Sequence, residues 1–350
     1  MAMEINANEV DIVVSVTRPD PSFLEAWMPF FSPYHVIVVQ EPELEENVKV
    51  PSGLNHTLYT KHDMERILGI GVLNSLGFRG HSCRAFGYLM SKKKYIFSLD
   101  DDCIPAKDPN GYLINPLEQH IVNLMNPSTP FFFNTLYDPY RDGSDFVRGY
   151  PFSLRQGVPC AISCGLWMNL PDYDAPTQIL KPDERNTRYV DAVLTVPHGA
   201  LFPMSGINIA FNREIIGPAM FSGLARSGAG KPLLSRYDTL EDIWCGLCCK
   251  VICDHLGYGI KTGLPYVWRK EDFGDPMVSL SREYEGVKWL EEIVPFFQAL
   301  RLPRTALTVE DCFAEIGKQV KDKFRNLDPL FSEVGTSMED WAKAWKAASS

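Results

Sequence analysis

Three consecutive acids, Asp100, Asp101 and Asp102, are the strongest chemical signal in this sequence. They follow residues 94–99, a short apolar run typical of a buried β-strand, and open α/β sheets bind ligands at the carboxyl ends of such strands. Neighbouring carboxylates repel one another, and burial increases the repulsion. A divalent cation relieves it, and oxygen ligands suit Mg²⁺ or Mn²⁺, which then bridge to phosphate oxygens. We therefore predict a metal–diphosphate site.

Strand alternation separates the roles of the three acids. If strand geometry persists through the triplet, Asp100 and Asp102 point to one face and Asp101 to the other. Asp100 and Asp102 are then the expected metal ligands, and Asp101 belongs to the same diphosphate-binding site without direct ligation. The alternative is a solvated turn that caps the next helix, which the apolar residues before the acids disfavour.

A second acidic pair, Glu241 and Asp242, opens a helix predicted over residues 242–256. Acids at a helix start interact favourably with the helix dipole, and that explanation alone accounts for the pair. The alternative is that Asp242 takes part in a reaction.

Four cysteines follow on the same helix, with a Cys-x-x-Cys spacing that also occurs in metal sites. Zinc sites usually take such pairs from loops, with a second pair elsewhere. These four lie along one helix face with apolar neighbours, which favours core packing. The total of nine is odd, and no secretory signal precedes them, so we expect reduced thiols. The four are Cys245, Cys248, Cys249 and Cys253.

The elements that position these residues alternate between strands and helices. A strand, a helix and a strand near the N-terminus form a βαβ unit and predict a parallel sheet in an α/β fold. After Pro303 the pattern changes to two amphipathic helices, and capping-box patterns place their starts at Thr308 and Ser337. The predicted strands are 10–16, 35–39, 94–99 and 130–136, and the predicted earlier helices are 21–31, 81–92, 116–124 and 242–256.

Composition narrows the class of protein. The chain has 350 residues, 45% of them hydrophobic and 22% charged, which is typical of a globular protein. The formal net charge of −10 argues against nonspecific binding to nucleic acid or to an anionic membrane. No stretch approaches the roughly 18 apolar residues of a membrane helix. We expect a soluble, cytoplasmic protein without a transmembrane segment.

Longer strings resemble a known family. The strand followed by Asp-x-Asp after βαβ units resembles the GT-A nucleotide-sugar glycosyltransferases. From about Val10 to Trp345 the chain resembles the plant UDP-arabinopyranose mutases, also called reversibly glycosylated polypeptides. The strings that carry the resemblance are Pro-Phe-Phe-Phe-Asn-Thr-Leu-Tyr-Asp-Pro-Tyr at 130–140, Asp-Phe-Val-Arg-Gly-Tyr-Pro-Phe-Ser-Leu-Arg at 145–155, Gly-Leu-Trp at 165–167, Pro-Asp-Tyr-Asp-Ala-Pro-Thr-Gln at 171–178, Arg-Asn-Thr-Arg-Tyr-Val-Asp-Ala-Val at 185–193 and Lys-Thr-Gly-Leu-Pro-Tyr at 261–266.

The resemblance implies a fold, an activity and partners. The implied fold is GT-A-like, with a UDP-sugar-binding catalytic domain over residues 1–303 and a helical extension over 304–350 packed on the same unit. The implied activity is interconversion of UDP-L-arabinopyranose and UDP-L-arabinofuranose for cell wall polysaccharide synthesis, with Mn²⁺ or Mg²⁺ and reversible self-glycosylation. The implied partners are UDP-arabinose, UDP-glucose, UDP-xylose, UDP-galactose and other family members in homo- or hetero-oligomers. The implied location is the cytoplasm, with peripheral association with the Golgi.

The resemblance also assigns roles to two arginines and an acid. Arg148 is implied to be the glycosylated residue and to face the nucleotide, Arg155 to support activity, and Asp242 to contact a sugar hydroxyl or act as a base. From chemistry alone a guanidinium is a poor nucleophile because it stays protonated, so it needs a nearby carboxylate such as Asp145, Asp142 or Asp242. The alternative is that both arginines clamp the diphosphate as fixed cations.

One position departs from the family pattern. Where mutase-competent relatives place a His after a Pro-Tyr-Ile-Trp string, this chain has Arg269 after Pro-Tyr-Val-Trp. An arginine cannot ligate a metal, so a third ligand is missing there. This favours an alternative function: an autoglycosylating, UDP-sugar-binding regulatory subunit with little mutase activity, which acts in complex with a competent relative. A GT-A transferase with an external acceptor is a further alternative.

Overall fold

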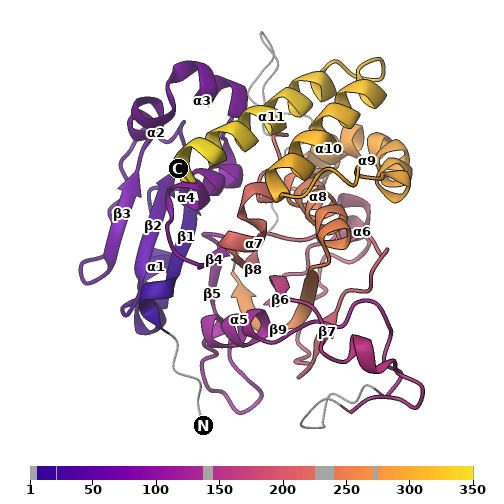
Figure 1. Cartoon of the computed structure of the whole chain (residues 1–350). Helices are drawn as coiled ribbons and strands as arrows, with labels where there is room; N and C mark the ends of the chain where they lie inside the picture. The colour runs from indigo at the N-terminus through magenta and orange to yellow at the C-terminus, as the bar shows by residue number, and fades with distance from the viewer. Residues whose placement is uncertain (1–5, 21, 137–144, 225–239, 271–274, 350) are drawn as a thin grey trace.

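The computed structural model describes residues 6–20, 22–136, 145–224, 240–270 and 275–349. Within these residues the chain forms an α/β fold around one mixed β-sheet, with helices against both faces and a helical layer at the C-terminal end (Figure 1). The α/β class expected from the sequence is confirmed. Within these residues, every helix is too short or too polar to span a lipid bilayer.

The sheet has a parallel half and a more mixed half. Its strand order is β3-β2-β1-β4-β8-β6-β9-β5, with β7 also paired to β9. From β3 to β4 all neighbours are parallel, so the predicted βαβ unit is confirmed. Strand β8 runs antiparallel to both β4 and β6, and β6 is parallel to β9. The strands are β1 Val10–Val16, β2 His35–Gln40, β3 Asn55–Tyr59, β4 Tyr95–Leu99, β5 Cys103–Pro105, β6 Cys160–Asn169, β7 Val193–Thr195, β8 Asn208–Asn212 and β9 Gly259–Arg269.

Two sets of helices cover the two faces of the sheet. Helices α1 and α5 pack on one face, and α4, α8, α10 and α11 build the core on the other. The helices are α1 Ser22–Phe31, α2 Lys61–Leu68, α3 Ile70–Leu76, α4 Arg84–Met90, α5 Pro116–Met125, α6 Ala175–Leu180, α7 Arg213–Ile216, α8 Glu241–Leu256, α9 Pro276–Ala299, α10 Val309–Phe324 and α11 Leu330–Ser349, with short 3-10 turns η1 Ala7–Glu9, η2 Gly80–Cys83, η3 Phe152–Leu154 and η4 Gly217–Ala219.

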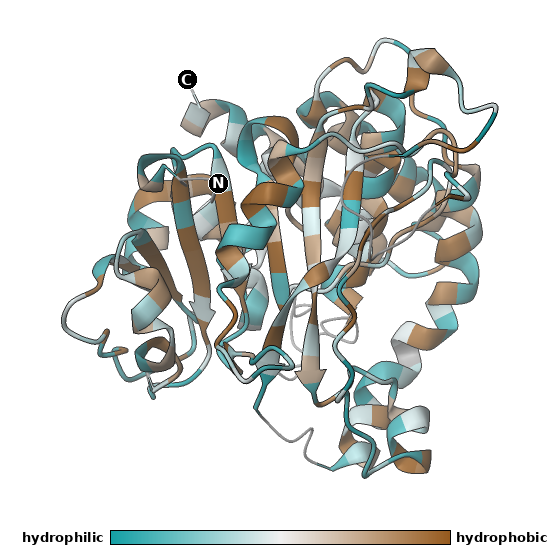
Figure 2. Ribbon diagram, turned by 90° about the horizontal axis from the view of Figure 1, so that it is seen from below, coloured by the Kyte–Doolittle hydropathy of each residue, from teal (hydrophilic) through white to brown (hydrophobic). Residues whose placement is uncertain are grey.

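The central strands are apolar because both of their faces are covered. In β1, Ile12 and Val14 pack toward α1, whereas Val13 packs toward α4, and the whole strand is buried. Strands covered on both faces have continuous apolar sequences. Figure 2 shows these strands as brown ribbons inside the molecule.

The cysteine-rich helix α8 belongs to this core. Its four cysteines are buried, unbonded and surrounded by apolar side chains, as the sequence predicts. Burial raises the pKa of Cys248 and Cys249 well above that of a free thiol, so these groups stay protonated and act as small apolar residues.

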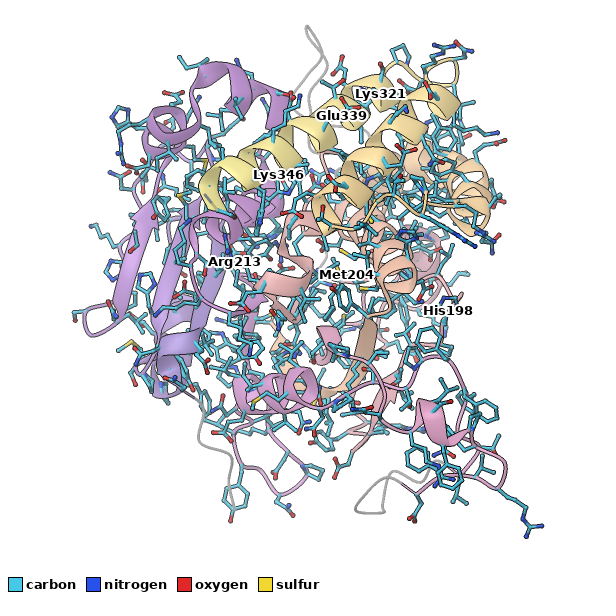
Figure 3. All side chains as sticks on the ribbon, viewed as in Figure 1. His198, Met204, Arg213, Lys321, Glu339 and Lys346 are labelled. Atoms are coloured by element: carbon cyan, nitrogen blue, oxygen red, sulfur yellow. The ribbon has the colours of Figure 1, made fainter. Side chains whose placement is uncertain are left out.

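The C-terminal helices join the two halves of the molecule. Helices α9, α10 and α11 gather at the upper right of Figure 1, and α11 then crosses to α3 in the N-terminal half. Lys321 of α10 pairs with Glu339 of α11 at 2.7 Å (Figure 3). Trp341 stacks on Phe221 with ring centroids 4.7 Å apart.

Three expectations about these elements need correction or completion. Thr308 does cap α10, since its hydroxyl accepts a hydrogen bond from the Asp311 amide at 3.2 Å. The predicted start at Ser337 is wrong: α11 begins at Leu330, and Ser337 lies buried within it, where its hydroxyl donates to the Ser75 carbonyl. The 24-residue helix α9 was not predicted, although Asp275 caps it.

The predicted strand 130–136 is also wrong. These residues form turns and irregular backbone, and none of the strands that the structure describes pairs with them. Their aromatic side chains are largely exposed, with Phe133 at 69%. The helix predicted over 81–92 is shorter than expected, with η2 leading into α4.

Candidate functional site

The acid triplet lies at the carboxyl end of β4, in the middle of the sheet. The strand ends at Leu99 and the chain turns at Asp101 and Asp102, so strand alternation does not persist. The three carboxylates instead diverge to three different partners. We call the set of residues that meet here the acidic edge: Asp100, Asp101, Asp102, Asp242, Arg84 and Arg269.

Asp100 forms a buried ion pair with Arg84. Arg84 Nη2 lies 2.8 Å from Asp100 Oδ1, and the side chains are 7% and 10% exposed. His81 Nδ1 lies 3.7 Å from the same oxygen. Burial works to raise the pKa of Asp100, but Arg84 and then His81 outweigh it, and the pKa is lowered. Asp100 is therefore ionised, and the positive charge of Arg84 compensates its negative charge.

Arg84 also connects Asp100 to Asp242 through Gly206. Arg84 Nη1 donates to the Gly206 carbonyl at 2.7 Å, and the Gly206 amide donates to Asp242 Oδ2 at 2.8 Å. A Cβ on Gly206 would lie 2.4 Å from Arg84 Nη1, so the position requires glycine. Burial raises the pKa of Asp242, and Arg84 only partly opposes this. Asp242 thus holds a proton more readily than an exposed aspartate.

Arg84 was not among the residues expected from the sequence, although it links Asp100 to Gly206. The available signal was a lone arginine in an otherwise apolar helical stretch, followed by Ala85 and Phe86. A charged side chain is buried in such a place only when it has a partner.

Asp101 ties the triplet to the end of β1. Its Oδ2 accepts hydrogen bonds from the backbone amide and the hydroxyl of Thr17, both at 2.8 Å. Arg18 Nη2 lies 4.0 Å from its other oxygen. Asp101 therefore fixes the loop after β1 against β4.

Asp102 pairs with Arg269 at the end of β9. Arg269 Nε donates to Asp102 Oδ2 at 3.0 Å, and its Nη1 donates to Asp172 Oδ1 at 2.9 Å. Burial works to lower the pKa of Arg269, but Asp172 and Asp102 outweigh it and raise the pKa, so the cation is permanent. The residue expected to stand where relatives have a His thus lies against a predicted metal ligand.

The carboxylates of the acidic edge are not arranged as the ligands of a divalent metal ion. Such an ion needs several oxygen ligands turned to one point. Over the described part of the chain, no three His, Cys, Asp or Glu side chains are grouped in that way. Asp100 and Asp102 each face a guanidinium instead. Metal ligation by these two carboxylates stays a prediction, and a cation would have to displace Arg269 from Asp102.

A small cavity opens beside Arg84 and Asp242. It has a volume of about 30 Å³ and is also lined by Tyr88, Ser222 and Met204. Figure 3 labels Met204 in the interior between the sheet and the C-terminal helices. The space suits about one water molecule rather than a sugar.

Arg148 and Arg155 lie on a separate structure, which we call the arm and define as residues 130–136 and 145–157. It is seen around η3 at the lower right of Figure 1. Asn134 holds its two parts together, since its amide group donates to the Asp145 carbonyl at 2.6 Å and accepts from the Val147 amide at 3.1 Å. Asp142 lies outside the described residues.

The arm leaves the sheet at the opposite end of the strands from the acid triplet. Ile162 of β6 pairs with Phe211 of β8, which pairs with Ile96 of β4, so the three residues lie level. The arm joins the sheet at Val158, before Ile162, whereas Asp100 follows Ile96. Because β6 and β4 run in the same direction, Val158 lies at their amino ends and Asp100 at their carboxyl ends.

The two arginines of the arm have different surroundings. Arg155 is half-buried, with its guanidinium 4.0 Å from the Phe152 ring centre and 5.0 Å from that of Phe146. Arg148 is exposed. The structure therefore brings Asp100, Asp102 and Asp242 together but does not bring either arginine to them.

Comparisons with known proteins settle the family. The model of the family described as reversibly glycosylated polypeptide matches residues 5–350. The chain belongs to this family. It is 58% identical over 99% of its length to probable UDP-arabinopyranose mutase 5 of Arabidopsis thaliana, covering 98% of that protein. It is 55% identical over 97% of its length to UDP-arabinopyranose mutase 1 of Arabidopsis thaliana, covering 92% of that protein.

A relative from rice and one solved structure complete the comparison. UDP-arabinopyranose mutase 1 of Oryza sativa subsp. japonica is 54% identical over 97% of this chain and 90% of its own. Mannosyl-3-phosphoglycerate synthase from Rubrobacter xylanophilus matches 86% of this chain and 80% of its own, with a TM-score of 0.37 and 12% identity. The family model and the relatives confirm, at the level of the family, the resemblance stated from the sequence strings.

Proposed function

We propose that this chain interconverts UDP-L-arabinopyranose and UDP-L-arabinofuranose for cell wall polysaccharide synthesis, and that Arg148 becomes reversibly glycosylated. The observation that carries the proposal is family membership over nearly the whole chain, with relatives named UDP-arabinopyranose mutase at 54–58% identity. The position of the acidic edge supports it, since α/β sheets bind nucleotides at the carboxyl ends of their strands.

The residues of the acidic edge suit a sugar diphosphate. The guanidinium groups of Arg84 and Arg269 neutralise Asp100 and Asp102, which lowers the repulsion that these acids would exert on a diphosphate. Arg18, beside Asp101 and 42% exposed, is placed to bind phosphate oxygens through paired N–H groups. In the proposed reaction UDP leaves the sugar, the pyranose ring opens, and reclosure through another hydroxyl gives the furanose before UDP returns. Asp242, with its raised pKa, exchanges a proton with a sugar hydroxyl through a water molecule in the adjoining cavity.

Partners and location follow from the same proposal. UDP-arabinose is the proposed substrate, with UDP-glucose, UDP-xylose and UDP-galactose as further sugar donors. Homo- or hetero-oligomers with family members, in the cytoplasm with peripheral association with the Golgi, complete the proposal.

One observation favours a second candidate function. Arg269 lies 3.0 Å from Asp102, the carboxylate predicted to share a metal ion. A guanidinium in that place neutralises the acid and leaves it less able to ligate Mn²⁺ or Mg²⁺. The chain would then bind UDP-sugars and glycosylate itself with little mutase turnover, acting as a regulatory subunit beside a competent relative.

One experiment separates the two functions. The purified chain is incubated with UDP-arabinopyranose and Mn²⁺, and the pyranose and furanose isomers are separated by chromatography. Radiolabel bound to protein is counted in parallel. Conversion by the chain alone supports the mutase, whereas label without conversion supports the regulatory subunit. A chain that neither converts the substrate nor takes up label contradicts both. Arg269→His is the informative variant, since a gain of conversion would tie the defect to this position.

A further inference from the structure

The acceptor of the proposed self-glycosylation lies at the wrong edge of the sheet for its own chain. We propose that Arg148 is glycosylated in trans: the arm of one copy carries Arg148 to the acidic edge of a second copy, which holds the UDP-sugar. The inference rests on the proposed function and names the partner of that same site.

The separation along the strands is large compared with a reacting distance. Val158 precedes Ile162 by four residues, Asp100 follows Ile96 by four, and Ile162 and Ile96 are level. At about 3.3 Å per residue, the two points lie about 26 Å apart along the strands. Group transfer requires the reacting atoms within about 3.5 Å. Arg148 therefore has to cross most of the sheet to reach the acidic edge of its own chain.

Crossing within one chain would require the arm to unfold. Ten residues link Arg148 to Val158 and span about 35 Å only when fully extended. Extension would break the turns in which the Tyr150 amide donates to the Val147 carbonyl at 3.0 Å and the Arg155 amide donates to the Phe152 carbonyl at 3.2 Å. It would also separate the Arg155 guanidinium from its aromatic neighbours. A second copy reaches Arg148 without any of these losses.

The surface of the arm fits a protein partner. Phe152 is 83% exposed and Phe133 is 69% exposed, and Phe131 and Phe132 add to the same region. Grouped exposed aromatic side chains mark interaction sites. Arg148 lies on the same arm, so a partner that packs on these rings also lies close to Arg148. In the proposed complex the partner is a second copy of this chain, which covers the rings and brings its own acidic edge to Arg148.

The chemical step balances without a further reactant. The bond between the anomeric carbon and the diphosphate oxygen breaks, and its electron pair leaves with UDP. A guanidinium nitrogen of Arg148 forms the new bond to the anomeric carbon and loses one proton. A carboxylate of the second copy takes that proton, with Asp242 as the candidate through a water molecule in the cavity beside it.

The test uses two co-expressed chains with different affinity tags. One carries Arg148→Lys, which keeps the acidic edge and removes the acceptor. The other keeps Arg148 and carries Asp100→Asn, with Asp242→Asn as the second choice if the first fails to fold or takes up label alone. The co-purified complex is incubated with a radioactive UDP-sugar, and the chains are then separated under denaturing conditions and counted.

We expect label on the chain with the altered edge, at least ten-fold above its signal alone. A wild-type chain that takes up label beside an unlabelled mixed complex would overturn the inference and leave the proposed function standing. An unlabelled wild-type chain would overturn both. Label on both altered-edge variants alone would also overturn the inference, because the acidic edge would not be the donor site.

A second measurement tests the arm surface. Phe152→Ser should lower the labelling rate of the wild-type sequence several-fold, with unchanged affinity for UDP. Leu307→Ser is the matched control, because Leu307 is 76% exposed and lies outside the arm. Equal labelling rates for the two variants would contradict the proposed contact.

Discussion

The acidic edge and the arm hold arginines in opposite surroundings. At the acidic edge Arg84 is 7% exposed and lies between Asp100 and Gly206, so its charge is part of the fold. On the arm Arg148 is exposed. A buried guanidinium cannot leave its partners without a large loss of stability, whereas an exposed one is free to react with something outside the chain. The difference separates residues that build the site from a residue presented to it.

The largest expected effect is on stability, at Arg84. Arg84→Met leaves the Asp100 carboxylate buried without its ion pair, and the free energy of unfolding should fall by about 3–5 kcal/mol. Arg148→Met, the matched change on the arm, should alter it by no more than about 0.5 kcal/mol. Urea unfolding followed by circular dichroism measures both. Equal losses would remove the distinction between the two regions.

A smaller loss is expected at Gly206, which touches the same arginine. Gly206→Ala places a Cβ 2.4 Å from Arg84 Nη1 and 2.8 Å from Asp242 Oδ2, so one of them has to move. The expected destabilisation is about 1–3 kcal/mol. Gly71→Ala is the control: its Cβ has no neighbour within 4 Å, and alanine in a helix is neutral or stabilising by up to about 1 kcal/mol. A neutral Gly206→Ala would show that the edge is looser than described.

Arg269 offers a way to open the acidic edge to a cation. Arg269→His removes the guanidinium from Asp102 and adds a nitrogen ligand, and the affinity for Mn²⁺ should rise about ten-fold, which corresponds to about 1.4 kcal/mol. Calorimetric titration with Mn²⁺ in the presence of UDP measures it. Asp102→Ala in the same background should cancel the gain, and a gain that survives this change would place the ion elsewhere.

The smallest expected effect is the pH dependence of stability. The pKa of folded Asp100 is lowered, so its contribution is complete above the unfolded value near 3.8 and is lost as the pH falls through the folded pKa. The pKa of Asp242 is raised, so its ionisation costs stability as the pH rises from 3.8 to the folded pKa. Asp100→Asn should flatten the acid limb of the urea midpoint between pH 2 and 5, and Asp242→Asn should remove the decline above pH 4. Leu307→Ser, at an exposed site without a titratable group, should leave the shape of the profile unchanged.

Much of the fold could be predicted because its signals are local. The apolar run of β1 predicts a buried strand, and the cysteines on one face of α8 predict core packing. Both predictions are confirmed. The prediction of a strand at 130–136 is wrong because an aromatic run indicates a buried strand only where another strand is available to pair with it. The prediction of a helix start at Ser337 is wrong because a capping pattern also occurs inside a helix. Here the Ser337 hydroxyl donates a hydrogen bond to the Ser75 carbonyl of a distant segment.

The sequence by itself determined the family, the α/β class and the acidic triplet after β4, since these depend on residue types and short spacings. Only the tertiary structure decided which cation meets each acid: Arg84 and Gly206 are 122 positions apart in sequence, and Arg269 and Asp102 are 167 apart. Through the pairing of β4, β8 and β6, it also decided that the arm with Arg148 joins the sheet at the amino ends of β4 and β6. Contacts between distant segments depend on how strands order and register in the sheet, and no local pattern encodes that order.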